Sequence, residues 1–308
     1  MKSRLFCGVL SLLFSCIAFA QESHPLEGKW NLIITEDGKE VPSWLEVRHS
    51  GTNTLVGQFC YKFGSARPVA EVKVDEGKFN FSIPNQWEPA GLDMQLIGVQ
   101  EGNQLKGTLI YTDGKTYSWV GSPAPKLPYN ENPTWGKSKK LFNGKNLDGW
   151  KAMGENQWIV EDGILKSPES GANLVTDEKF TDFKIHVEFK YPEGSNSGLY
   201  LRGRYEVQIA DNKGLAPSDI YFGGIYGHLT PNENVAKSAG EWQEFDITLI
   251  GRRVTIVANG KTIISNQNIP GMTGGALDND EAAPGPILIQ GDHGPVEFKS
   301  IEIRPILK

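Results

Sequence analysis

The sequence predicts an all-β protein with two domains, a small antiparallel β-barrel-like domain followed by a two-sheet jelly-roll sandwich. Three observations lead to this prediction. Almost every periodic segment alternates with period two, and no window of a dozen residues carries a helical apolar stripe. Turn signals such as Asp-Gly and Asn-Gly separate these segments at short intervals. A proline-rich stretch without periodicity, residues 122–138, divides the chain.

The first 20 residues have the pattern of a cleavable secretory signal. Lys2 and Arg4 precede a short apolar run, and Ala18-Phe19-Ala20 precede Gln21. We therefore expect export, most simply to the periplasm. The alternative is a lipid anchor at Cys16, because "LFSC" resembles a lipid-attachment box. The apolar run is too short to span a bilayer and no later stretch is apolar enough, so the sequence predicts no membrane span.

The net charge argues against nucleic acid and anionic membranes as partners, and the cysteine content argues against a disulfide bond. Cleavage after residue 20 would remove Lys2 and Arg4 from 31 basic residues and nothing from 37 acidic ones, which leaves a net charge of −8. An acidic chain of this kind is a poor partner for nucleic acid or an anionic membrane. Cys60 would then be the only cysteine, so no intrachain disulfide could form and stability would come from burial.

Residues 21–121 are expected to form the first domain. Segments such as "KWNLIITEDGKEV", "TLVGQFCYKF" and "NQLKGTLIYTDGKTYSWVG" read as short strands joined by hairpins. Strands this short and regular indicate a small antiparallel barrel filled by its own side chains. The linker, residues 122–138, follows.

Residues 139–308 are expected to form the second domain, of ordinary size. It contains ten or more strand-like segments, with Asn259-Gly260 as a strong hairpin signal. A long glycine-rich loop, "KGLAPSDIYFGGIYGHLTPNENVAKSAG", interrupts them. This number and spacing of strands is typical of a two-sheet sandwich.

Alternation also singles out a polar face in this domain. In "KIHVEFK" and "GLYLRGRYEVQIAD", it turns Glu188, Tyr200, Arg202, Glu206 and Gln208 away from the core. If these strands are neighbours in one sheet, the five side chains converge on one concave face that could hold a polyol. The simpler interpretation is a set of ordinary cross-strand charge pairs, each contributing about 0.2–1 kcal/mol.

Two loops of the same domain favour the binding interpretation. The glycine-rich loop carries Tyr226 and His228, and "QGDHG" carries Gln290, Asp292 and His293. Binding groups are commonly found on loops that a rigid sandwich supports.

Six motifs occur here in an order that resembles the 3-keto-disaccharide hydrolase family, long catalogued as a domain of unknown function. They are "LFNGKNLDGW", "NSGLYLRGRYEVQIAD", "GGIYGH", "GEWQEFDI", "VANGK" and "IQGDHGPVEFKSIEIRP", and the resemblance covers residues 139–308. It implies a concanavalin A-like sandwich. Residues 25–121 more weakly resemble an accessory β domain found in some secreted members.

The resemblance implies a small-molecule substrate, a glycoside whose C3 hydroxyl a separate sugar 3-dehydrogenase has already oxidised to a ketone. The ketone acidifies the C2 proton, so a base can remove it, the enolate can expel the aglycone from C1, and water can add back. Such a site needs one base, a stabiliser of the enolate oxygen and groups that fix the ring. It does not need the paired carboxylates of ordinary glycosidases.

Each role has candidates on this interpretation. His293 is the first candidate for the base, and Glu188 is the alternative. Arg202 would hold hydroxyls or stabilise the enolate oxygen. Tyr200, Glu206, Gln208, Tyr226, Gln290 and Asp292 would bind substrate. His228 stands where the family would have Gln, which argues against a catalytic role for it.

Two questions stay open at the level of sequence. No cofactor is certain, but His186, His228 and His293 with Glu188, Glu206 and Asp292 could assemble a divalent metal site. No close ligand spacing supports one. The second question is whether the polar face belongs to an enzyme or to a non-catalytic, lectin-like carbohydrate-binding protein.

Overall fold

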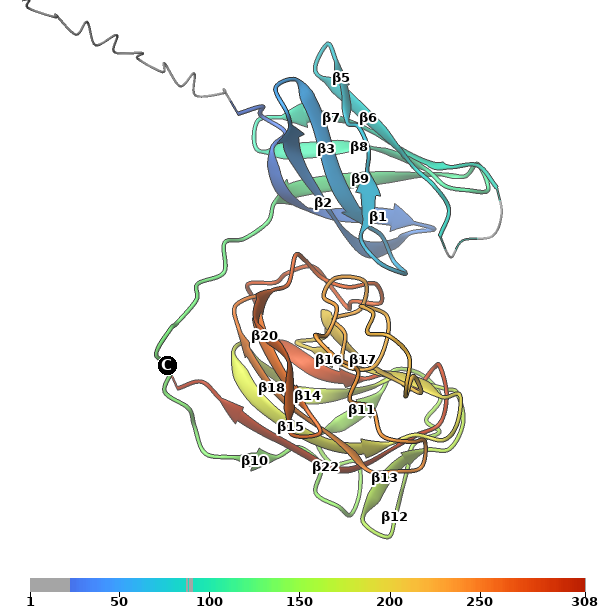
Figure 1. Cartoon of the computed structure of the whole chain (residues 1–308). Coiled ribbons are helices and arrows are strands. Elements are labelled where there is room, and N and C mark those ends of the chain that lie inside the picture. The colour runs from blue at the N-terminus through green and yellow to red at the C-terminus, as the bar shows by residue number, and fades with distance from the viewer. Residues whose placement is uncertain (1–22, 87, 89–90, 308) are drawn as a thin grey trace, which may run out of the picture.

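A computed structural model describes residues 23–86, 88 and 91–307. The expected signal segment, residues 1–20, and Cys16 within it lie outside the described residues. Figure 1 shows two β-rich bodies joined by an extended segment that runs along one side of the molecule. The described residues contain no helix long and apolar enough to cross a membrane. The all-β prediction is confirmed.

The first body is one antiparallel sheet. Its strands are β1 (Gly28–Glu36), β2 (Lys39–Ser50), β3 (Thr54–Cys60), β4 (Arg67–Val69), β5 (Lys73–Asp75), β6 (Lys78–Ile83), β7 (Met94–Glu101), β8 (Gln104–Ile110) and β9 (Thr116–Pro123). They pair in the order β4-β3-β2-β1-β9-β8-β7-β6-β5. The sheet curls so that β4 approaches β6, although no ladder joins these two strands among the described residues.

Buried and exposed residues alternate along the strands of this sheet, so that one side of the sheet forms the core. In β6, Phe79, Phe81 and Ile83 are buried while the residues between them are exposed. The Trp119 ring of β9 packs against Phe79, with ring centroids 6.1 Å apart. The concave side is therefore filled by the sheet's own side chains, as a small barrel-like domain requires.

The second body is a sandwich of two antiparallel sheets. The larger sheet contains β10 (Lys139–Lys140), β12 (Ile159–Glu161), β13 (Ile164–Ser167), β15 (Phe183–Lys190), β18 (Gln243–Ile250), β19 (Arg253–Ala258), β20 (Lys261–Asn268) and β22 (Val296–Pro305). The smaller contains β11 (Trp150–Ala152), β14 (Leu174–Phe180), β16 (Asn196–Leu201), β17 (Tyr205–Ala210) and β21 (Gly285–Ile289), in the order β11-β14-β21-β16-β17.

The inner faces of both sheets form one core. Ile185 and Val187 of β15 meet Leu199 of β16 and Val207 and Ile209 of β17 in the same buried cluster. The prediction that these five residues face the core is therefore confirmed. The expected hairpin between β19 and β20 is also present, because Asn259 and Gly260 have φ angles of 48° and 79°.

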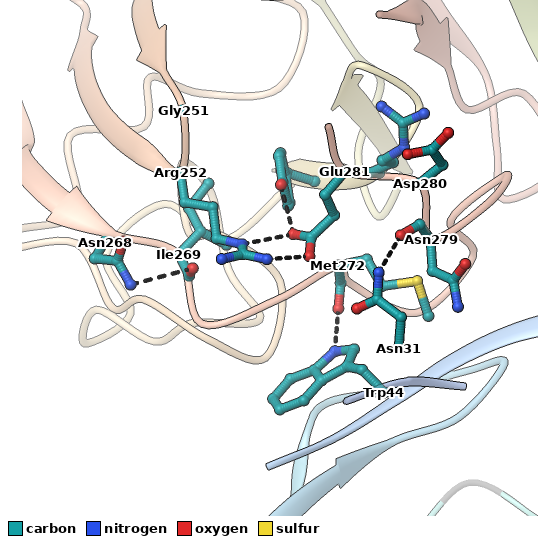
Figure 2. A network of polar contacts seen from close by, with 12 residues as sticks. Asn31, Trp44, Gly251, Arg252, Asn268, Ile269, Met272, Asn279, Asp280 and Glu281 are labelled. Carbon is teal, nitrogen blue, oxygen red and sulfur yellow. Dashed lines mark hydrogen bonds and ion pairs between the residues drawn. The ribbon is translucent and has the colours of Figure 1, made fainter. Parts of the chain in front are cut away.

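The two bodies meet along a polar and aromatic interface (Figure 2). Trp44 Nε1 of β2 donates to Met272 O over 2.8 Å. Asn279 Nδ2 donates to Leu32 O over 2.7 Å, and Asn31 Nδ2 donates to Asn279 O. The thiol of Cys60 lies buried beside Trp44 and Met272. These bonds attach residues 272–279 of the sandwich to β1 and β2.

A buried charged network supports the same segment from within the sandwich. Glu281 forms an ion pair with Arg252, whose Nε donates to Glu281 Oε1 over 2.8 Å. The hydroxyl of Tyr205 donates to the same oxygen over 2.6 Å. Burial pushes the pKa of Glu281 upward, but hydrogen bonds from Arg252 and Tyr205 outweigh it, so the pKa lies below its usual value of 4.5.

We expect Glu281→Gln to lower the free energy of unfolding by about 3–5 kcal/mol, because Arg252 would keep a buried charge without its partner. A folded-state pKa below 4.5 means that this stabilisation is present above about pH 4.5 and is lost as the pH falls through the folded pKa. Urea unfolding at several pH values measures both effects.

Glu233→Gln is the matched control, because Glu233 pairs with Lys261 with side chains that are 48% and 61% exposed. Exposed pairs contribute at most about 1 kcal/mol. Equal losses in the two variants would contradict the structural role given to Glu281.

Candidate active site

The polar face predicted for the second domain is built on the hairpin of β16 and β17. Tyr200 pairs with Glu206 and Gly198 pairs with Gln208. Because Leu199 and Val207 point into the core, Tyr200, Glu206 and Gln208 share the outer face of the smaller sheet. Glu206 lies there with only 4% of its surface exposed. The hairpin therefore presents a buried carboxyl group on the side away from the core.

Gly198 makes room for this carboxyl group. A Cβ atom at position 198 would lie 2.3 Å from Glu206 Oε1, which is closer than any real contact. The Glu206 side chain thus lies flat over the backbone of the neighbouring strand. Only glycine at position 198, diagonally across from Glu206 on the neighbouring strand, allows this placement.

The environment of Glu206 favours its protonated form. Tyr200 OH donates to Glu206 Oε2 over 2.9 Å, and the Tyr200 hydroxyl oxygen also lies 3.0 Å from Gly274 O. Burial raises the pKa of Glu206 to about 8, with a further rise from Asp292, while Tyr200 and His293 act in the opposite direction. A carboxylic acid with this pKa can donate a proton near neutrality.

His293 and Asp292 form a pair in the loop that follows β21. Their Nδ1 and Oδ1 atoms are 2.6 Å apart, and both side chains are about half exposed. The hydrogen bond to Asp292 raises the pKa of His293, and the same bond lowers the pKa of Asp292. Nδ1 is engaged, whereas Nε2 has no hydrogen-bond partner among the described residues. Nε2 is therefore free for proton transfer.

This loop is attached directly to the hairpin. Gln290 N donates to Gly198 O over 2.9 Å, and Ser197 Oγ donates to Gln290 O over 2.8 Å. The attachment brings His293 near enough to Glu206 for each charge to shift the pKa of the other.

The glycine-rich loop covers the free edge of β17. Gln208 N donates to Gly224 O over 2.9 Å, and Tyr226 N donates to Glu206 O over 3.0 Å. Burial, and then the charge of Glu206, raises the pKa of Tyr226. Tyr226 is thereby placed beside the hairpin, and its role in substrate binding stays a prediction.

Buried amide oxygens complete this face. Gln208 Oε1, Gln290 Oε1 and Asn196 Oδ1 are buried and have no hydrogen-bond partner in the described part of the chain. Buried acceptors are rarely left without donors, so each of these oxygens is expected to accept from a water or from a hydroxyl group of a ligand. Asn196 was not among the predicted site residues, although it lies two residues before Gly198 and therefore points to the same side of β16.

The expected position of Glu188 is wrong. β15 belongs to the larger sheet, so Glu188 lies on the outer face of that sheet, on the opposite side of the sandwich from Glu206. There it accepts a hydrogen bond from Lys299 Nζ over 2.7 Å. The chain crosses from one sheet to the other between β15 and β16, and alternation alone cannot reveal such a crossing. Glu188 therefore cannot act as the base of a site on the smaller sheet.

The expected position of Arg202 is also wrong. It lies in the turn after β16 with a φ of 56°, and it is buried. Its guanidinium group donates to Gly251 O over 2.6 Å and to Tyr205 OH over 3.2 Å. Tyr205 belongs to the core cluster, so Arg202 points away from the face that carries Glu206. Its role is to join the hairpin turn to neighbouring loops.

The three histidines considered for a metal site lie apart. His228 lies partly buried at the domain interface, where its Nε2 is 3.1 Å from Met272 O and desolvation lowers its pKa to about 4. His186 pairs with Asp246 on the outer face of the larger sheet. Among the described residues, no group of three or more His, Cys, Asp or Glu side chains is placed to hold a metal ion.

An open groove of about 470 Å³ lies on that same outer face, lined in part by His186, Asp246 and Glu302. Asp246 is exposed and already paired with His186. The buried titratable group and the orphaned amides lie instead on the smaller sheet, so we place the candidate site there.

We expect Glu206→Gln to flatten the pH dependence of stability between about pH 4.5 and 8. A carboxyl pKa raised from 4.5 to about 8 means that the folded state binds more protons than the unfolded state in this range. The stabilisation from protonated Glu206 is present below about pH 4.5 and is lost as the pH rises toward 8. Thermal unfolding of both proteins across this range tests the expectation, and identical slopes would contradict it.

Comparisons with known proteins identify the family of this chain. The model of the 3-keto-alpha-glucoside-1,2-lyase-like domain family matches residues 137–304. A 3-keto-disaccharide hydrolase of Bacteroides thetaiotaomicron is 31% identical over an alignment of 110 residues, and the match covers 30% of this chain and 37% of that protein. The match thus spans little more than a third of the curated relative.

Two solved structures, each called a "putative glycosyl hydrolase" from Parabacteroides distasonis ATCC 8503, are 27% and 26% identical to this chain. The alignments cover 59% and 55% of this chain and 94% and 100% of theirs, with TM-scores of 0.47 and 0.44. The family match covers more than half of the sequence, and the chain therefore belongs to the 3-keto-alpha-glucoside-1,2-lyase-like domain family.

Proposed function

We propose that this protein cleaves 3-keto glycosides by removing the C2 proton, expelling the aglycone from C1 and adding water to the product. The observation that carries the proposal is a buried carboxyl group with a pKa of about 8, beside a histidine–aspartate pair on a face with orphaned amide oxygens. Family membership and the name of the curated relative support the same substrate class.

The carboxylates of this face do not fit an ordinary glycosidase well. Such enzymes use two carboxyl groups in complementary roles across the glycosidic bond. Here Asp292 is engaged by His293, which leaves Glu206 as the available carboxyl group. One acid and one imidazole base suit an elimination from a ketone better, because the ketone has already acidified the proton to be removed.

In the proposed reaction, His293 Nε2 takes the C2 proton. Asp292 holds the ring through Nδ1 and stabilises the imidazolium that forms. The electrons of the C2–H bond form an enolate with the C3 ketone. Their return expels the C1 oxygen and leaves an unsaturated ketone. The enolate oxygen would need a hydrogen-bond donor on this face to stabilise it.

Glu206 supplies the proton that the leaving oxygen needs. It begins as a neutral acid, protonates the departing alcohol and becomes a carboxylate. That carboxylate then takes a proton from the water that adds at C1, while His293 returns its proton to C2. The net reaction is hydrolysis, and both side chains end in their starting states.

The remaining residues of the face would bind the sugar. Gln208 and Gln290 offer amide oxygens to its hydroxyl groups, and Tyr226 borders the site from the covering loop. Tyr200 positions Glu206. A separate sugar 3-dehydrogenase would supply the ketone, and export through residues 1–20 would place the reaction outside the cytoplasm.

The decisive assay compares a glucoside with its 3-keto derivative, using purified residues 21–308 with and without a chelator. Release of aglycone from the keto form alone supports elimination. Equal cleavage of both forms would contradict it. Binding without cleavage of a panel of keto glycosides would favour the lectin-like alternative.

We expect His293→Ala to lower kcat by about 10²–10⁴-fold for every 3-keto glycoside. The reason is that the base removes the C2 proton before the bond to the leaving group breaks. Circular dichroism and the thermal midpoint should change little, since the side chain is half exposed. A folded variant with unchanged turnover would remove His293 from the mechanism.

We expect Glu206→Gln to have an effect that depends on the leaving group. Methyl 3-keto-glucoside needs a proton on its departing oxygen and should lose about 10²-fold or more in kcat. The 4-nitrophenyl derivative needs little protonation and should lose far less. In the wild type, kcat/KM should also fall above about pH 8 as Glu206 ionises. Equal losses for both substrates would contradict the role as an acid.

A further inference from the structure

We infer that the N-terminal domain positions the proposed acid Glu206 through residues 272–275, which lie between that domain and the β16–β17 hairpin. Trp44 is the positioning residue on the side of the N-terminal domain. The inference deepens the proposed function and rests on it. It gives the accessory domain control over how well Glu206 can act as an acid, in addition to its packing role.

One side of residues 272–275 is bound to the N-terminal domain. Trp44 Nε1 donates to Met272 O over 2.8 Å (Figure 2). Gly275 N donates to Lys62 O over 2.9 Å. These bonds lie at the two ends of the segment, so both of its ends are attached to the same domain.

The other side of the segment is bound to the hairpin that carries Glu206. Glu206 N donates to Thr273 Oγ1 over 3.0 Å, and Thr273 N donates to Arg204 O over 2.9 Å. The Tyr200 hydroxyl lies 3.0 Å from Gly274 O. The groups that hold Glu206 in place are therefore themselves held by the N-terminal domain.

The Gly274 carbonyl favours the neutral form of Glu206. The Tyr200 hydroxyl lies 2.9 Å from Glu206 Oε2 and 3.0 Å from Gly274 O, but it has only one proton to donate. If Glu206 is ionised, Tyr200 donates to the carboxylate and Gly274 O loses this donor. If Glu206 is neutral, its own proton can be donated to the Tyr200 oxygen, while the Tyr200 proton goes to Gly274 O. Both contacts are then hydrogen bonds, so a carbonyl fixed at this distance stabilises the protonated acid.

Trp44 also contacts the covering loop. The ring centroids of Trp44 and His228 are 5.8 Å apart, and His228 Nε2 lies 3.1 Å from the Met272 oxygen that accepts from Trp44. Two residues before His228, Tyr226 N donates to Glu206 O over 3.0 Å. Trp44 therefore contacts both of the segments that bind the main chain of Glu206.

A looser interface should lower the pKa of Glu206 from about 8 toward its usual value of 4.5. Burial is the largest cause of the raised pKa, and entering water would reduce it. A displaced Gly274 carbonyl would act in the same direction. The other titratable groups around Glu206 and Trp44 are Tyr200, Tyr226, Asp292, His293, His228 and Lys29.

The test measures kcat/KM against pH for methyl 3-keto-glucoside with the full chain. Trp44→Phe removes the indole N–H but keeps an aromatic ring. The alkaline fall in kcat/KM should begin about 0.5–1 pH unit lower than in the wild type, which is a loss of about two- to fivefold at pH 8. The 4-nitrophenyl derivative should lose less, because its leaving group needs little protonation.

A second variant disturbs the same contact from the sandwich, and a third is the matched control. A Cβ atom at Gly271 would lie 2.6 Å from the Trp44 ring, so Gly271→Ala should shift the profile in the same direction. Trp30 Nε1 donates to Leu26 O over 2.9 Å within the N-terminal domain. Trp30→Phe therefore removes an equivalent buried bond outside the interface, and it should leave the pH profile unchanged.

Two outcomes would overturn the inference. In the first, the profiles of Trp44→Phe and Gly271→Ala superimpose on that of the wild type. In the second, Trp30→Phe shifts the profile as much as Trp44→Phe does, which would mean that the shift reflects general destabilisation.

If the wild type cleaves neither substrate, the proposed reaction fails, and the pH dependence of stability decides the positioning role. The difference in free energy of unfolding between each protein and its own Glu206→Gln variant isolates the contribution of Glu206 from those of the other titratable groups. In the wild type this contribution should be lost as the pH rises from about 4.5 to 8. In Trp44→Phe the loss should end at a lower pH, and identical curves would refute the role of Trp44.

Discussion

The removal of the Glu206 carboxyl group from water is the constraint on which the rest of the site depends. A carboxyl group on the outer face of a sheet would ordinarily be solvated and ionised. Here Gly198 lets the side chain lie flat, Tyr200 engages one oxygen, and the loop around Tyr226 covers the strand edge. The burial that results keeps the group neutral at a pH at which a solvated carboxyl group would be charged, although the hydrogen bond from Tyr200 acts in the opposite direction.

Much of this fold follows from alternation, because a strand with one buried face has a period of two wherever it lies. The inward positions of β15, β16 and β17 and the Asn259-Gly260 hairpin could therefore be predicted from the sequence. So could the shared face of Tyr200, Glu206 and Gln208, because the hairpin between them is short.

The errors show what the alternation of residues along a strand cannot determine. Alternation states which side of its own sheet a residue occupies, but not which sheet the strand joins. Glu188 was misplaced for that reason, because β15 and β16 lie in different sheets. Arg202 was misplaced because it lies in a turn, where the period of two no longer applies. The burial of Glu206 depends on loops far away in the sequence, so no local pattern could reveal its raised pKa.

Chemical labelling of Cys60 can report the opening of the interface between the domains. Its thiol is fully covered beside Trp44 and Met272, and burial raises its pKa to about 12. Alkylating reagents attack the thiolate and need access to it. A closed interface therefore protects this sulfur in two ways, because it keeps the thiol protonated and it excludes the reagent. The rate at which Cys60 is labelled would therefore report how often the two bodies separate, without any engineered probe.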